Sequence, residues 1–171
     1  MVVAFAVTID DEHSLQFSRA VQRQILTATY RAIGDRWQTK WLPRHFTRRA
    51  RDIYGYHPRS KKYQARKERA AQRAGSKIKK GGRVDLVYTG LAERLFSKRH
   101  AIRAYPTRAT INIHGPTYVS MRPRQGNTRA IGPEVLKVIP EELRDLDDTG
   151  QKTLETLMKK APRRQRKIKG R

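Results

Sequence analysis

Basic side chains are concentrated in two stretches of the chain, and neither stretch can form a protein core. Residues 59–83 contain 11 Lys and Arg residues against one Glu, and residues 159–171 contain 8 basic residues and no acid. Only 37% of the 171 residues are hydrophobic, against roughly 45–50% in a typical globular protein. Because charged groups are buried only when they are paired, we expect one modest domain whose basic extensions are solvated or lie on a partner.

The excess charge favours a polyanionic partner. The chain carries 39 basic and 15 acidic residues, a net charge of +24 at pH 7, and such a surface repels itself unless a partner neutralises it. Nucleic-acid phosphates would do so with release of counterions, whereas the alternative is a solvated face that only maintains solubility. The candidate phosphate-facing residues are Arg59, Lys61, Lys62, Arg66, Lys67, Arg69, Arg73, Lys77, Lys79, Lys80, Arg83, Arg163, Arg164, Arg166 and Lys167.

A long amphipathic helix is predicted near the N-terminus. Apolar residues recur mainly every three or four positions across residues 12–40, which is typical of a helix with one buried side. We expect the acids of residues 10–12 in its first turn, where they suit the helix dipole. Pro43 interrupts the pattern and would begin a second helix. Trp37 and Trp41 lie on one side of the long helix, which favours a core or subunit contact over base stacking.

The N-terminal residues 2–9 are apolar and β-branched, as in a strand. The rest of the predicted core is small, so we expect this arm to dock on a neighbouring subunit or on another protein. Packing of the arm within its own sheet is the alternative. Deleting the arm would leave the subunit folded in the first case and unfold it in the second.

The second half of the chain alternates polar and apolar residues, as strands with one buried face do. Strands are expected over residues 84–88, 102–105, 108–113, 117–121 and 135–139, with a short helix over residues 91–97. Pro140 begins a C-terminal helix that Gly150 divides. The predicted fold class is α+β: a small antiparallel sheet packed with a long N-terminal helix and a C-terminal helix, with basic extensions.

These elements divide the chain into five parts. They are an N-terminal arm (1–11), a helical region (12–58), a basic insertion (59–83), an α+β core with the C-terminal helix (84–158) and a basic tail (159–171). Within the core, residues 134–155 carry seven acids. We expect them to form a separate acidic face that contacts other subunits.

The sequence offers little evidence for catalysis. It has no cysteine, which excludes a disulfide, a thiolate zinc site and a cysteine nucleophile. The five histidines lack metal-ligand spacing, so we assign them surface or phosphate-facing roles. The acids Glu141, Glu142, Asp145, Asp147 and Asp148 could ligate Mg²⁺, but acids near a helix start more often stabilise the helix. We expect no cofactor, no metal and no enzymatic activity, and no apolar run is long enough to cross a membrane.

Two short motifs flank the predicted strand 108–113. Thr89-Gly90 precedes a short segment with Leu and Arg, and a hairpin ends in Gly115-Pro116-Thr117-Tyr118. With the aromatic and basic residues that begin at Tyr54, these motifs resemble neck and tail-completion (tail terminator-like) proteins of tailed bacteriophages. Tyr88 stands where those proteins more often have an acid, so the adaptor, terminator and completion roles all stay open.

The resemblance implies a structural virion protein without enzymatic activity, assembled as a ring of six or twelve copies that joins capsid and portal to tail around the DNA exit channel. Its partners would be copies of itself, portal, adaptor or tail-tube proteins, and packaged DNA through phosphate contacts. It would be located in the virion neck after assembly in the host cytoplasm, without a membrane partner. A ribosomal or other RNA-binding structural protein is the alternative, because the composition fits it equally well.

Overall fold

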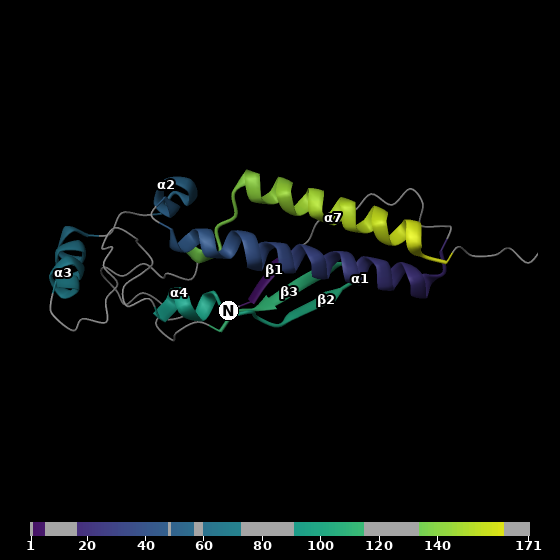
Figure 1. Cartoon of the computed structure of the whole chain (residues 1–171), viewed down its shortest axis with the longest axis horizontal. Coiled ribbons are helices and arrows are strands. Elements are labelled where there is room, and N and C mark those ends of the chain that lie inside the picture. The colour runs from purple at the N-terminus through teal and green to yellow at the C-terminus, as the bar shows by residue number, and fades with distance from the viewer. Residues whose placement is uncertain are drawn as a thin grey trace, which may run out of the picture.

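The computed structural model describes residues 2–5, 17–47, 49–56, 60–72, 91–114 and 134–162. In chain order the elements are β1 (Val2–Phe5), α1 (Arg19–Arg36), the π-helical turn η2 (Trp37–Trp41), the 3₁₀ helix η3 (Leu42–Phe46), α2 (Ala50–Tyr54), α3 (Lys61–Gln72), α4 (Leu91–Phe96), β2 (Ile102–Tyr105), β3 (Arg108–Asn112) and α7 (Pro140–Lys160). Figure 1 shows α1 as the middle layer, with α7 on one side and the sheet on the other. The predicted α+β class is confirmed.

The sheet has three antiparallel strands in the order β1-β3-β2, so β3 is the central strand. The tight turn Pro106-Thr107 joins β2 to β3. β1 pairs with β3 of the same chain, from Val2 opposite Asn112 to Phe5 opposite Ala109. The prediction that the arm docks on a neighbouring subunit is therefore wrong for residues 2–5, and the alternative is confirmed. β1 supplies hydrogen-bond partners for the second edge of β3, which the β2–β3 hairpin alone would leave open.

α1 begins later than predicted. Its N-cap is Ser18, whose hydroxyl accepts a hydrogen bond from the Val21 amide at 3.4 Å, and its first turn contains no acid. The expectation that the acids of residues 10–12 start this helix is wrong, because the local N-cap of Ser18 sets the start instead.

Two sides of α1 are buried, because the helix lies between two layers. The buried residues include Ile25, Tyr30 and Ile33, whereas a single apolar side was predicted. Glycines allow α1 to approach the layer on each side closely. A β-carbon at Gly34 of α1 would lie 3.1 Å from Ile102 Cγ2 of the sheet. A β-carbon at Gly150 of α7 would lie 3.0 Å from Ile33 Cδ1 of α1. Gly150 is therefore a packing residue within a continuous α7, and the prediction that it divides this helix is wrong.

Beyond Arg36 the chain continues through η2 and η3 without leaving a helical path. Pro43 lies in the first turn of η3, as predicted for a proline that begins a helix. Trp37 and Trp41 are fully buried, which confirms a core position for both. Gly55 ends α2 in the left-handed conformation, with φ of 59°.

Most predicted elements of the second half are found where the structure describes the chain. α4, β2, β3 and the start of α7 at Pro140 agree with the prediction. The strand expected over residues 135–139 does not form: the Lys137 amide donates to the Glu134 carbonyl in a turn, and Val135 is buried in the core. The strands expected over residues 84–88 and 117–121 lie outside the described residues.

Candidate functional site

The predicted phosphate-facing residues are only partly within the described chain. Lys61, Lys62 and Arg69 are exposed on α3, where the Arg69 guanidinium also donates to the Ala65 carbonyl at 3.3 Å. Arg66 and Lys67 lie in the same helix. The other candidates lie outside the described residues, as do the motif residues: Arg59, Arg73, Lys77, Lys79, Lys80, Arg83, Arg163, Arg164, Arg166, Lys167, Thr89, Gly90, Gly115, Pro116 and Tyr118.

A second basic surface, which the sequence interpretation missed, lies on the hairpin β2–β3. Ile102 and Ala109 of the hairpin face Gly34 of α1, and strand alternation places Arg103, Tyr105 and Arg108 on the opposite face. All three are exposed. The Arg108 guanidinium lies 5.5 Å from the centroid of the Tyr105 ring, within cation–π range.

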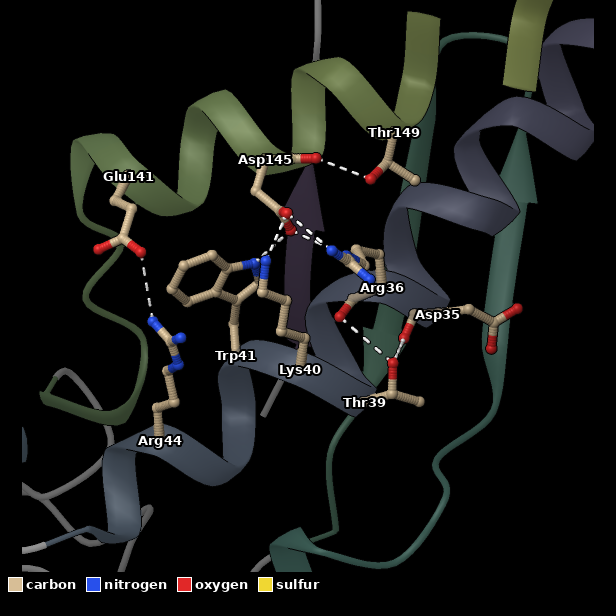
Figure 2. A network of polar contacts seen from close by, with 9 residues as sticks. All are labelled: Asp35, Arg36, Thr39, Lys40, Trp41, Arg44, Glu141, Asp145 and Thr149. Carbon is tan, nitrogen blue, oxygen red and sulfur yellow. Dashed lines mark hydrogen bonds and ion pairs between the residues drawn. The ribbon is translucent and has the colours of Figure 1, made fainter. Parts of the chain in front are cut away.

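Asp145 of α7 is the centre of a polar network that ties α7 to the end of α1 (Figure 2). Arg36 binds its carboxylate in a bidentate manner at 2.8 and 2.9 Å, and Lys40 Nζ lies 2.5 Å from Oδ1. The indole N–H of Trp41 donates to Oδ2 at 2.8 Å. These donors, the Arg36 guanidinium first, hold the pKa of the Asp145 carboxyl well below its usual range.

The acids of residues 134–155 are used largely within the chain. Glu134 and Glu142 are buried, Asp145 forms the network above, and Glu141 pairs with Arg44 at 3.4 Å. The prediction of a separate acidic face that contacts other subunits is therefore wrong for Glu134, Glu142 and Asp145. The physical reason is that α7 packs on the end of α1 and on η2, which present Arg36, Lys40 and the indole N–H of Trp41. Glu141, whose side chain is 68% exposed, remains on the surface of α7 together with Asp147, Asp148 and Glu155.

A buried polar cluster joins η3, α2 and α7. The His45 ring is stacked on Tyr54, with centroids 3.9 Å apart, and its Nδ1 makes a short hydrogen bond with the Tyr56 hydroxyl. The Tyr54 hydroxyl donates to Glu142 Oε1 at 2.5 Å, and His45 Nε2 lies 4.0 Å from the same oxygen. The side chains of His45 and Glu142 are completely buried. The surface role predicted for the histidines is thus wrong for His45, and also for His100, which is buried too.

Burial determines the charge states in this cluster. Desolvation lowers the pKa of His45 to about 4, so the imidazole is neutral at pH 7. Desolvation also raises the pKa of Glu142, although hydrogen bonds from Tyr54 and Trp37 favour its charged form. A second histidine, His100, is buried beside the Phe96 carbonyl, and burial lowers its pKa. We interpret the His45 cluster as a device that fixes the fold, because the Tyr54 and Tyr56 hydroxyls join its buried side chains across three elements. His45 Nε2 and Glu142 Oε2 are buried in the same cluster without a hydrogen-bond partner among the described residues.

Among the described residues, no group of three or more His, Cys, Asp or Glu side chains is placed to hold a metal ion. In the same part of the chain, no helix combines the length and the apolar character needed to cross a bilayer. Comparisons with protein-family models, with curated proteins and with solved structures found no match to this chain.

Proposed function

We propose that this chain is a structural protein of a bacteriophage virion, a ring-forming subunit of the neck that joins capsid and portal to tail around the DNA exit channel. The observation that carries the proposal is that several acids are partnered within the fold, whereas many basic groups of the described chain are exposed and form no ion pair. Four acids of α7 and the preceding turn contact groups of their own chain: Glu134, Glu141, Glu142 and Asp145.

Basic groups, by contrast, are left on the surface. Arg19, Arg23 and Arg31 of α1 are exposed, as are the described Lys and Arg side chains of α3 and of the hairpin β2–β3. None of these side chains forms an ion pair with an acid among the described residues. A surface of this kind suits a subunit that lies against packaged DNA and stabilises it through phosphates.

The phage resemblance supports the more specific part of the proposal. A neck ring would place a basic protein next to DNA without a need for base recognition, and it would place the subunit in the virion. Contacts with portal, adaptor or tail-tube proteins would then use other surfaces of the chain. The three neck roles of adaptor, terminator and completion protein are all compatible with this surface.

Binding to duplex DNA is expected to depend steeply on salt and little on sequence. If at least six phosphates are neutralised, affinity should fall by about 10³-fold or more between 50 and 200 mM salt. Fluorescence anisotropy with two labelled duplexes of unrelated sequence measures both properties. Equal affinity for the two duplexes within a few fold is expected, since phosphates carry no sequence information. A response to salt that is nearly flat would contradict the proposal.

A further inference from the structure

The outer face of the hairpin β2–β3 is not covered by any described element. α1 and α7 both lie on the other side of the sheet (Figure 1). The face carries Arg103, Tyr105 and Arg108, with the partly exposed Thr110 and Asn112 beside them on β3. We call these five residues the outer sheet face. Tyr105 is 44% exposed, so much of its ring is open to solvent.

The charge of the residues around this face indicates what kind of partner it fits. The chain has no Asp or Glu between Glu93 and Glu134, and the same interval contains Arg103, Arg108 and further basic residues. Among the described residues, neither of these two arginines forms an ion pair with an acid. A second copy of the same face would be repelled, because it would bring like charges together. A polyanion is the complementary occupant.

The geometry of the hairpin favours an extended row of phosphates over a single anion. Tyr105 lies directly opposite Arg108, and Arg103 lies opposite Thr110. The two arginines are therefore diagonal neighbours, whose backbone positions are about 7–8 Å apart. A DNA strand carries one charge per ~3.4 Å of helix axis, so two guanidinium groups at this spacing can reach different phosphates of one backbone. The Asn112 amide adds a neutral group of the type that contacts phosphates. The Thr110 hydroxyl already donates to the Arg103 carbonyl at 3.2 Å and ties the two strands together.

We propose that the outer sheet face binds the phosphodiester backbone of duplex DNA, with Arg103 and Arg108 as the phosphate ligands. Tyr105 holds the Arg108 guanidinium beside its ring, and so positions it on the surface. This inference rests on the proposed function and deepens it, because it assigns the DNA contact to a surface outside the basic insertion and the basic tail.

The test compares two double variants of the full-length chain that each remove two positive charges. R103Q/R108Q changes the outer sheet face, and R144Q/K152Q changes two exposed residues of α7, on the far side of α1. The probe is a fluorescein-labelled 20-base-pair duplex, titrated by anisotropy from 50 to 200 mM salt. Circular dichroism and thermal melting verify that both variants fold, which is expected because all four side chains are exposed.

For R103Q/R108Q we expect the slope of log K against log salt to decrease in magnitude by about 1.8, which is ~0.9 for each lost phosphate contact. Affinity at 0.1 M salt should fall on the order of 60-fold by the same relation. R144Q/K152Q should change affinity by no more than about threefold, because charges that do not touch DNA act only through the screened field. Equal behaviour of the two variants would overturn the inference.

Two further outcomes would also overturn it. If R103Q/R108Q abolishes ring assembly while the salt slope stays unchanged, the face is a subunit contact. If Tyr105→Leu lowers the affinity for single-stranded DNA about tenfold or more but leaves the affinity for duplex DNA unchanged, the face is a stacking platform for unpaired bases. In either case, a steep dependence of duplex affinity on salt for the unmodified chain would still support the proposed function. A flat dependence would contradict the proposed function itself.

Discussion

Trp41→Ala is expected to destabilise the protein by about 3–5 kcal/mol, the range for removing a buried aromatic side chain. Trp41 is completely buried, and its indole N–H donates to Asp145 at 2.8 Å. The Arg44 guanidinium lies 4.3 Å from the ring centroid. The substitution therefore removes packing, a hydrogen bond and a cation–π contact at the junction of α1, η3 and α7. Urea unfolding at pH 7, followed by far-UV circular dichroism, measures the loss.

Trp41→Phe is the matched control, because it keeps an aromatic ring and loses only the indole N–H and some ring area. We expect it to cost about 1–2 kcal/mol, since Asp145 keeps its contacts with Arg36 and Lys40. In both variants Trp37 remains as a fluorescent reporter of the core. A cost below about 1 kcal/mol for Trp41→Ala would show that this junction does not hold the fold together.

Acid is expected to weaken the fold through His45 by about 3 kcal/mol between pH 7 and pH 4. The pKa of His45 is lowered from 6.5 to about 4 by burial, so the folded state binds this proton less readily than the unfolded chain. The stability that the neutral ring contributes is therefore complete above pH 6.5 and is lost as the pH falls toward 4. Glu142 acts with the opposite sign. Its pKa is raised in the folded state, so its buried charge costs stability as the pH rises above the pKa that this group has in the unfolded chain.

The double variant H45F/Y56F isolates the histidine contribution. It removes both partners of the buried hydrogen bond together, so neither polar group is left unsatisfied, and it keeps Glu142 and Tyr54. The free energy of unfolding, measured by urea titration at half-unit steps of pH, should decline less steeply for the variant than for the parent chain. Parallel curves from pH 7 to pH 4 would contradict a neutral, buried His45.

Local patterns were sufficient to predict most elements of the fold. Alternation of side chains predicts β2 and β3, and Pro140 followed by acids predicts the start of α7. These signals depend on residues close together in the sequence. The N-cap at Ser18 has the same local character, but the acids of residues 10–12 offered a competing start.

The stacking of α7, α1 and the sheet in three layers could not be predicted in the same way, because it depends on contacts between distant parts of the chain. A glycine within a helical pattern indicates a break when it is considered alone. Only the approach of Ile33 to Gly150 shows that the small residue serves close packing between α1 and α7. The two buried sides of α1 follow from the same arrangement.

The candidate site shows a similar division. A search for dense charge along the chain finds Lys61 and Lys62, whereas Arg103 and Arg108 are separated in sequence and meet only through hairpin register. The available signal was the interval without acids between Glu93 and Glu134, combined with one arginine in each of two consecutive predicted strands. The burial of His45 gave no such signal, since Glu142, its partner across the core, is far away in the sequence.

Electron microscopy of particles isolated through an affinity tag on this chain tests the proposed function most directly. The account predicts tailed virions in which the tagged chain forms a closed ring of several identical copies between capsid and tail, with DNA passing through its centre. Ribosome-like particles that hold one copy of the chain against RNA, without contacts between copies, would contradict the account and favour an RNA-binding structural protein instead.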